Sequence, residues 1–321
     1  MAEHPNKTLV SFVIPCYRSR DTIRGVVDEI FSAMETMEQY DTEIVLVNDC
    51  SPDDTFSVLS ELAQSDGRIT AVNLARNFGQ ASAIMAGLRQ SAGDILVCMD
   101  DDGQTPANEV GKLLSKLEEG YDVVYASYEH KQHSAFRNFG TKLNNLMTEL
   151  LLEKPRELTI TSYFTMRRYV VDEMLRYEQC YPYIEGLVLR TTRKIASVPV
   201  THRQREVGES GYTFSKLLGM WMNGFTAFSV KPLRIATYAG CLSAFLGLIY
   251  TIIIVIKHFT DSTIPEGWSS TMAVQLLIGG IILVVLGLIG EYVGRIYLCI
   301  NASPQFVVRD VVKKEKSHGE N

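Results

Sequence analysis

Three consecutive acidic residues, Asp100, Asp101 and Asp102, follow an apolar segment at residues 94–99 that is typical of a buried strand. Carboxylates so close together repel one another unless a cation lies among them. Hard divalent cations prefer carboxylate oxygens, and Mg²⁺ also takes substrate phosphates as ligands. Because side chains alternate along an extended chain, the first and third acids point the same way. The triplet therefore predicts a site for Mg²⁺ or Mn²⁺ and a diphosphate, with an acidic surface turn as the alternative.

Further polar residues follow three other strand-like segments. Pro15 and Tyr17 come after the first, Asp49 after the second and Arg76 after the third. An Asp and a backbone segment in these positions can recognise a base and a ribose through hydrogen bonds, with Tyr17 packing beside the base. Arg76 can hold a phosphate or pair with the acidic triplet. Each signal is weak alone, because an Asp in the turn after a strand often has only a structural role.

The second half of the chain carries basic and hydroxyl-bearing residues that suit an anionic phosphate. Arg137 and Thr141 are four residues apart, so on a helix they would share one face. Lys131 lies just before them, and Arg205 and Ser210 belong to a small, flexible segment. One such arginine alone is typical of a solvated surface charge. As a group they lie between the acidic triplet and two apolar runs, which favours a phosphate-binding role.

The elements that must position these residues alternate along the first half of the chain. Short apolar segments with strand character are separated by stretches with helical periodicity. The strand-like segments are residues 9–15, 43–47, 69–74 and 94–99. This alternation predicts an α/β fold with a mostly parallel sheet between helices. In such sheets ligands bind at the carboxyl ends of the strands, which is where the polar residues fall.

Two long uncharged runs lie near the C-terminus, at residues 235–256 and 267–290. As helices each would be about 30 Å or more long, which is enough to cross a bilayer. The alternative is a pair of buried core helices, but core helices rarely stay uncharged over such a length. Lys231 and Arg234 precede the first run, and Arg295 follows the second. The positive-inside rule then places both termini in the cytoplasm.

Charge and the N-terminal residues narrow the class of protein further. The formal net charge of −6 argues against general nucleic-acid binding. Residues 1–8 contain charged side chains and no apolar core, so no signal peptide is predicted and the first part of the chain is expected to stay in the cytoplasm.

In combination, the motifs resemble the family 2 glycosyltransferases that act on polyprenyl phosphates. They span nearly the whole chain and include LVSFVIPCY, VLVNDCSPDDT, NLARNFGQASAIMAGL, GDILVCMDDDGQ, REVGESGY and GEYVGRIY. The resemblance implies a GT-A catalytic domain, which is a Rossmann-like fold, followed by a membrane-bound part. The expected order is a cytoplasmic GT-A domain at 1–210, an interfacial amphipathic segment at 211–233, a transmembrane helix at 234–257, an external loop at 258–270, a second transmembrane helix at 271–293 and a cytoplasmic tail at 294–321.

The resemblance and the residue patterns described above together give individual residues their expected roles, with Arg76 and Lys131 included on the pattern alone. Metal ligands are expected at Asp100, Asp102 and Gln104. The donor nucleotide-sugar is expected to contact Pro15, Tyr17, Asp49, Arg76, Asp100 and Asp101. The acceptor phosphate is expected to contact Lys131, Arg137, Thr141, Arg205 and Ser210, the last two on a mobile loop. The catalytic set is then Asp100, Asp102, Arg137 and Arg205.

The chain departs from the family pattern at five places, two of which are Tyr163-Phe164 in place of a Phe-Arg pair and Tyr128 in place of the first Arg of the acceptor region. Arg18 and Ser19 stand where the family has Asn-Glu, and Asn48 replaces the first Asp of an Asp-Asp pair. An acidic residue sometimes proposed as a base is absent near Thr161 and Ser162. These departures affect the donor and acceptor contacts and leave the acidic triplet whole.

The sequence thus predicts an inverting, metal-dependent transfer of a sugar from a nucleotide-sugar, with UDP favoured, to a polyprenyl phosphate, with undecaprenyl phosphate favoured. The expected location is the inner membrane, with contact to the lipid bilayer; homo-oligomerisation is left open. Two alternatives remain. A processive polysaccharide synthase of the same fold would need a general base and a QxxRW-type segment. A non-catalytic binding protein on a degenerate transferase scaffold would not turn over a nucleotide-sugar.

Overall fold

The computed structural model describes residues 7–103, 105–128, 158–201, 268–300 and 304–314, together with residues 238, 240, 242, 245 and 249. The chain divides into two compact units. The first is formed by Met1–Thr213 and Ser303–Asn321, and the second by Phe214–Ala302. The first unit contains the sheet and the acidic triplet, so it carries the candidate site.

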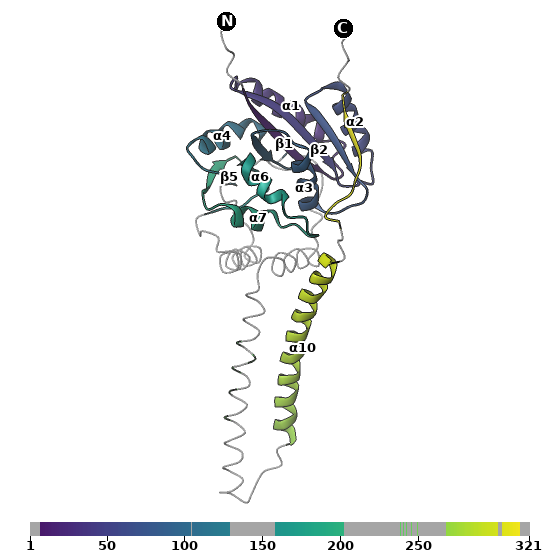
Figure 1. Ribbon diagram of the computed structural model, residues 1–321, viewed down its shortest axis with the longest axis vertical. Coiled ribbons are helices and arrows are strands. Elements are labelled where there is room, and N and C mark those ends of the chain that lie inside the picture. The colour runs from purple at the N-terminus through teal and green to yellow at the C-terminus, as the bar shows by residue number, and fades with distance from the viewer. Residues whose placement is uncertain are drawn as a thin grey trace, which may run out of the picture. The chain divides into compact units, whose positions relative to one another are not determined.

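A single eight-stranded sheet organises the described part of the first unit (Figure 1). Its strands are β1 (Thr8–Cys16), β2 (Tyr40–Asn48), β3 (Ile69–Leu74), β4 (Ile95–Cys98), β5 (Val123–Tyr128), β6 (Phe164–Arg167), β7 (Ile195–Val200) and β8 (Val308–Lys313). Their spatial order is β7-β5-β6-β4-β1-β2-β3-β8. The contiguous strands β4, β1, β2 and β3 are parallel, as the sequence predicts, while β6 and β8 run antiparallel to their neighbours.

Helices connect the strands in the alternating pattern that the periodicity predicts. They are α1 (Ile23–Glu35), α2 (Thr55–Ser65), α3 (Gln80–Gln90), the short 3-10 helix η1 (Ala107–Glu109), α4 (Val110–Glu118), α6 (Arg168–Leu175) and α7 (Ile184–Thr191). α1, α2, α4 and α6 each bury one apolar face, whereas α3 is buried all round at residues 82–88 and α7 is buried over most of residues 184–189. The sheet is therefore a rigid platform whose carboxyl edge presents the connecting loops.

The alternation of side chains along β1 separates two apolar layers. Phe12 and Ile14 belong to a core cluster that also contains buried residues of α1, α2 and α4. Val13 points to the other face, where it meets α3. Gly87 permits that close approach, since a Cβ there would lie 2.4 Å from Val13 Cγ1 and 3.0 Å from Val47 Cγ2. Any larger residue at 87 would push α3 away from the sheet.

The C-terminal strand β8 was not expected from the sequence, which assigned residues 294–321 to a tail. Val308–Lys313 instead pairs antiparallel with β3, at the edge of the sheet. Figure 1 shows this yellow segment running along the N-terminal half of the domain. Residues from both ends of the sequence therefore form one sheet, and the edge of β3 that would otherwise be open is covered.

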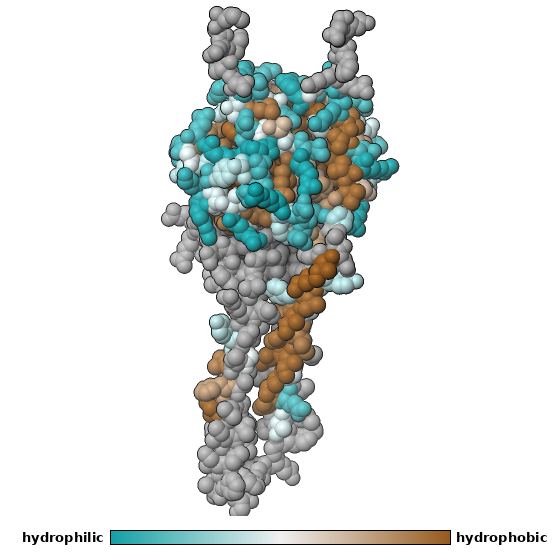
Figure 2. All heavy atoms as spheres, in the orientation of Figure 1, coloured by the Kyte–Doolittle hydropathy of each residue, from teal (hydrophilic) through white to brown (hydrophobic). Residues whose placement is uncertain are grey.

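The second unit contains the helix α10 (Trp268–Ile300), which includes the sequence predicted as the second span. Counting only residues whose side chains the structure describes, no helix is both long and apolar enough to qualify as a membrane span. The described side chains of α10 are mostly apolar and form a nearly continuous hydrophobic strip in Figure 2. Most of the first predicted span lies outside the described residues.

Candidate functional site

The acidic triplet lies just past the carboxyl end of β4, in the loop that leads to η1. Asp100 accepts hydrogen bonds from Gln80 Nε2 at 2.9 Å and from the Ser162 hydroxyl. Neither donor carries a charge, so these contacts orient the carboxylate without neutralising it. Gln80 begins α3, and Ser162 precedes β6. Asp100 is thus fixed by elements on two sides of the strand that carries it.

Asp101 faces a different neighbour, the loop after β1. Its carboxylate accepts hydrogen bonds from the Tyr17 amide, at 3.1 Å, and from the Ser19 hydroxyl. Burial raises the pKa of Asp101 to about 6, and the nearby Asp100 charge adds to that rise, while the two hydrogen bonds oppose it. Asp101 therefore ties the triplet to the β1 loop that holds the predicted nucleotide contacts.

Asp100 and Asp102 both lie near the hydroxyl of Tyr128, the last residue of β5. Burial raises the pKa of Tyr128 to about 12, and the charges of Asp100 and Asp102 also raise it, against a hydrogen bond with Thr105. The first and third acids thus act on a common neighbour, whereas Asp101 contacts the β1 loop. The assignment of Asp100 and Asp102 as metal ligands stays a prediction.

Asp49 is buried where β2 ends and accepts two backbone hydrogen bonds, from Phe78 N at 2.7 Å and Gly79 N at 2.9 Å. Burial raises its pKa, and these two bonds lower it. Gly79 has a φ of +88° and immediately precedes α3. The carboxylate therefore fixes the start of α3, so the structural role considered for a turn Asp is present here.

The other predicted nucleotide contacts differ in exposure. Pro15 is buried near the end of β1, whereas Tyr17 is 47% exposed, with the Arg18 guanidinium 5.7 Å from its ring centre. Arg18 has a φ of +60°, a left-handed conformation that turns the chain sharply after Tyr17. The exposed part of the Tyr17 side chain thus lies at the carboxyl edge of the sheet, where the prediction places the base.

Arg76 is exposed in the loop between β3 and α3, and its guanidinium lies 4.6 Å from the centre of the Phe78 ring. Of the two roles considered for it, pairing with the acidic triplet does not occur among the ion pairs of the described residues. The contact with Phe78 orients Arg76, which leaves the phosphate-binding role as a prediction.

The remaining predicted site residues lie outside the described residues. This applies to the metal ligand Gln104 and to the acceptor-phosphate group Lys131, Arg137, Thr141, Arg205 and Ser210. Their roles stay predictions.

Sequence reasoning missed three residues that contact the triplet: Ser19, Gln80 and Ser162. Ser19 and Ser162 stand at positions that differ from the family pattern. The Ser19 hydroxyl donates to Asp101 at a position where the family has a Glu. The Ser162 hydroxyl donates to Asp100 near the position where an acidic base has been proposed for the family. In both cases a hydrogen-bond donor stands in place of a negative charge.

The carboxylate oxygens of the triplet suit a hard divalent cation if substrate phosphates supply the other ligands. Among the described residues, no three His, Cys, Asp or Glu side chains gather closely enough to form a metal site alone. Asp100, Asp101 and Asp102 are nevertheless consecutive in the loop after β4, and burial together with the Asp100 charge raises the pKa of Asp101. Crowded carboxylates at a strand end supply hard oxygen ligands, and substrate phosphates can complete the coordination of Mg²⁺.

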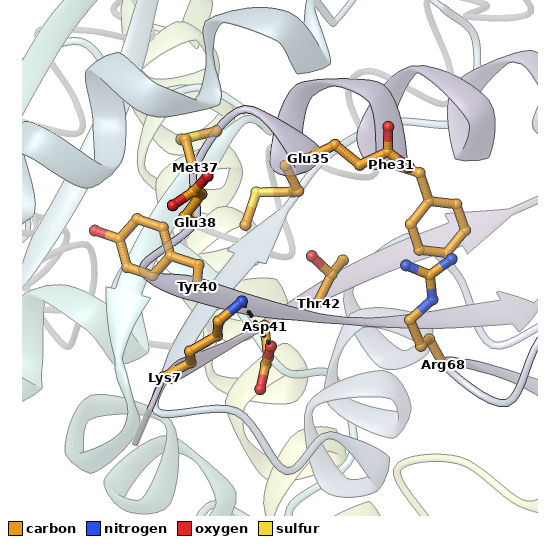
Figure 3. A pocket seen from close by; sticks show the side chains of 10 residues that line it. Lys7, Phe31, Glu35, Met37, Glu38, Tyr40, Asp41, Thr42 and Arg68 are labelled. Atoms are coloured by element: carbon orange, nitrogen blue, oxygen red, sulfur yellow. Dashed lines mark ion pairs between the residues drawn. The ribbon is translucent and has the colours of Figure 1, made fainter. Parts of the chain in front are cut away.

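A surface hollow at the other end of the sheet contains none of the predicted site residues (Figure 3). It is lined by residues of α1, the start of β2 and Arg68. Its two cations are already engaged: Lys7 Nζ lies 3.9 Å from Asp41 Oδ1, and the Arg68 guanidinium lies 3.9 Å from the centre of the Phe31 ring. Because ligands in open α/β sheets bind at the carboxyl ends of the strands, the acidic loop remains the candidate site.

Comparisons with known proteins match both halves of the chain. Residues 11–175 match the family model of glycosyl transferase family 2, and residues 231–296 match the GtrB C-terminal hairpin. The undecaprenyl-phosphate 4-deoxy-4-formamido-L-arabinose transferase of Klebsiella pneumoniae subsp. pneumoniae is 33% identical over 325 residues, covering 99% of this chain and 98% of the relative. The uncharacterized glycosyltransferase YkcC of Bacillus subtilis is 36% identical, covering 96% and 94%.

Solved structures resemble the chain in fold. The glucosyl-3-phosphoglycerate synthase of Mycobacterium tuberculosis, in complex with Mn²⁺, uridine diphosphate and phosphoglyceric acid, has a TM-score of 0.51 at 19% identity. The match covers 67% of this chain and 75% of that one. Mannosyl-3-phosphoglycerate synthase from Rubrobacter xylanophilus has a TM-score of 0.50 at 21% identity, covering 71% and 74%. The predicted GT-A fold is confirmed.

Proposed function

The chain belongs to glycosyl transferase family 2, and from that premise we propose that it transfers a sugar from a nucleotide-sugar to the phosphate of a polyprenyl lipid with inversion at the anomeric carbon. One observation carries the proposal. Asp100, Asp101 and Asp102 lie just past the carboxyl end of β4, where Asp101 accepts a hydrogen bond from the loop after β1 and Asp100 accepts one from α3. This arrangement would couple a diphosphate site to a nucleotide site.

The donor would bind along the carboxyl edge of the sheet. Asp100 and Asp102 would hold Mg²⁺ or Mn²⁺, which when bound neutralises charge on the departing nucleoside diphosphate. The solved structure of the Mycobacterium tuberculosis enzyme contains Mn²⁺ and uridine diphosphate, which supports a UDP-sugar as the donor. Tyr17, on the loop held by Asp101, would pack beside the base. Arg76, oriented by Phe78, would reach the phosphates.

The acceptor would be an anionic phosphate, so its oxygen can attack the anomeric carbon without a protein base. A bond forms between that oxygen and the anomeric carbon as the bond from carbon to the diphosphate breaks, and no proton needs to be moved. The undecaprenyl-phosphate transferases among the relatives support a polyprenyl phosphate as the acceptor. Arg137 and Arg205, assisted by Lys131, Thr141 and Ser210, would align the two anions and offset their repulsion.

We place the protein at the inner membrane, with the catalytic unit in the cytoplasm. Apolar side chains at Ile278, Ile282, Leu286 and Val293 of α10 expose 40–57% of their surface. They recur at helical spacing, which suits a surface in contact with lipid. The match of residues 231–296 to a C-terminal hairpin supports two antiparallel helices. This anchoring would keep the active site close to the headgroup of the lipid acceptor.

The full-length chain is expected to sediment with membranes and to need detergent for extraction. Replacing Ile282 and Leu286 together by Lys should shift it toward the soluble or aggregated fraction. Each charge at the centre of a membrane helix costs about 2.5–3.5 kcal/mol. Lys313→Gln in the sheet serves as the control and should not change the distribution. A full-length chain that is monodisperse in plain buffer would contradict the anchoring.

A screen of UDP-sugars and GDP-sugars tests the proposed function. Membranes containing the full-length chain are mixed with each donor, undecaprenyl phosphate and Mn²⁺, and the lipid product is identified by mass. The expected product carries one sugar on the lipid phosphate, with release of nucleoside diphosphate. Growth of a polymer on a sugar hydroxyl would favour a processive synthase, and absence of any turnover with every donor would favour a binding protein.

A further inference from the structure

Three polar side chains form a row across the strands at one end of the sheet. Asn48 is the register partner of Asn73, and Asn73 is the register partner of Asp310. Side chains directly opposite each other on neighbouring strands lie on the same face. Asn48 Nδ2 donates to Asn73 Oδ1 at 2.8 Å, and Asn73 Nδ2 donates to Asp310 Oδ2 at 3.0 Å. We call this chain of hydrogen bonds the amide relay.

The amide relay has a direction, and Asp310 sets it. A carboxylate can only accept, so Asn73 must turn its NH₂ group toward Asp310 and its oxygen toward Asn48. Asn48 must then turn its NH₂ group toward Asn73. That leaves the Asn48 Oδ1 atom to accept a hydrogen bond from the Ser51 amide, at 3.2 Å. If Asn73 were reversed, Asn48 would reverse as well and would present a donor to the Ser51 N–H.

The far end of the amide relay holds the loops that carry the nucleotide contacts. Ser51 lies two residues after Asp49, and its hydroxyl accepts a hydrogen bond from the Arg18 amide at 2.8 Å. Arg18 directly follows Tyr17 and has the left-handed conformation that turns this loop. The position of Ser51 therefore bears on both Tyr17 and the segment after Asp49.

The strand that supplies Asp310 is itself well anchored. Val307 O accepts a hydrogen bond from Ala75 N at 2.9 Å, just before Arg76. Gln305 is buried and donates to the carbonyls of Tyr177 and Gln179, at 3.1 and 3.0 Å. These contacts fix the register of β8, so Asp310 is held opposite Asn73. The C-terminal segment is thus connected through β3 and β2 to the predicted donor site, although it lies outside the motifs that predict that site.

We propose that Asp310 is a positioning residue for the donor nucleotide, acting through Asn73 and Asn48 on the loops that contain Tyr17 and Asp49. The inference rests on the proposed function, because it assigns the nucleoside diphosphate to those loops. The side chain of Asp310 is about half exposed and also lies 3.6 Å from Arg309 Nε, an exposed pair that contributes little. The role of Asp310 is therefore to fix the orientation of the Asn73 amide.

The test uses the full-length protein in detergent, titrated with UDP and separately with GDP in the presence of Mn²⁺. Asp310→Ala should raise the dissociation constant of whichever nucleotide the wild type binds by about threefold to tenfold, because Asn73 can then reverse. Lys313→Ala, on the same strand, is the control and should bind as the wild type does. In transfer assays the KM for the donor should rise while kcat and the KM for the lipid phosphate hold steady.

A second substitution separates orientation from simple support of the strand. Asn73→Asp puts a side chain at 73 that can only accept, so it receives the Asn48 NH₂ group whatever stands at 310. In the single variant Asn73→Asp, the half-exposed Asp310 side chain can turn to solvent and so avoid the new carboxylate at position 73. The double variant Asn73→Asp/Asp310→Ala should therefore recover wild-type nucleotide affinity. Its melting temperature should be lower than that of the wild type, because the hydrogen bond between residues 73 and 310 is lost.

The outcomes distinguish the two proposals. If the wild type binds neither UDP nor GDP, the proposed donor site is wrong and the role of Asp310 falls with it. If the wild type binds and Asp310→Ala binds equally well, the positioning role alone is wrong. If Asp310→Ala loses affinity and Asn73→Asp does not restore it, β8 supports the fold without setting the orientation of the amide relay, and the proposal is again overturned.

Discussion

Asp102→Asn is expected to abolish sugar transfer while leaving the fold intact. The substitution changes almost no volume but removes a full negative charge from a proposed metal ligand. Asp102 lies in the same loop as Asp100, two residues further along the chain, and the two carboxylates are proposed to share one cation. Loss of a positioned electrostatic contact of this kind typically costs about 100-fold to 1,000-fold in rate. Transfer to undecaprenyl phosphate, measured by product mass, should fall at least that far.

Asp101→Asn is the matched control, because it makes the same chemical change one residue away. The Asp101 carboxylate holds the Tyr17 amide and the Ser19 hydroxyl within the protein. An amide oxygen can still accept from the Tyr17 N–H, so the loop should persist and activity should fall much less. A larger loss from Asp101→Asn than from Asp102→Asn would show that the ligands are assigned wrongly.

Thermal unfolding gives an independent measure of the same assignment. Ligands that bind only the folded protein stabilise it according to their concentration and affinity. Mn²⁺ and UDP together should raise the melting temperature of the wild type and of Asp101→Asn, but not that of Asp102→Asn. Without metal, Asp102→Asn should be as stable as the wild type or slightly more stable, because one repelling charge has been removed. A clear loss of stability in the absence of ligands would point to misfolding instead.

The strands that flank the site could be predicted from the sequence because their apolar composition matches their burial in the folded sheet. β1 to β4 are short apolar runs buried on both faces, and α1 and α2 between them each show one apolar face. Central parallel strands have this composition wherever they occur, so no long-range information was needed to recognise them. The polar residues after them then fall at the carboxyl edge by geometry alone.

The strand β8 and the contacts of the triplet could not be predicted in the same way. The segment at Val308–Lys313 is exposed along much of its length and has charged residues among its valines. It becomes a strand because β3 offers an unpaired edge, which is a property of the tertiary fold. Likewise Ser19 meets Asp101 from 82 residues away, and Ser162 meets Asp100 from 62. A hydroxyl in a loop gives no local signal of such a partner.

Removal of divalent cations is expected to stop transfer and to be fully reversible. Chelation with EDTA followed by dialysis should lower the rate by roughly a thousandfold, since a bound metal typically supplies several kcal/mol of charge stabilisation. The reason lies in the local charge: Asp100 and Asp102 would face the incoming diphosphate, and the Gln80 amide and the Ser162 hydroxyl that donate to Asp100 carry no charge. Without a cation these anions repel one another.

Adding back Mn²⁺ or Mg²⁺ should restore the rate, and calorimetry should show that UDP binds much more weakly to the chelated protein. Circular dichroism should be unchanged by chelation, because the sheet and its core are held by apolar burial and hydrogen bonds. Asp102→Asn should respond little to added metal, which links the cation to that residue. Undiminished transfer to the lipid phosphate after complete chelation would rule out a metal at the triplet. The acids would then have a structural role, through their hydrogen bonds to the Tyr17 loop and to α3.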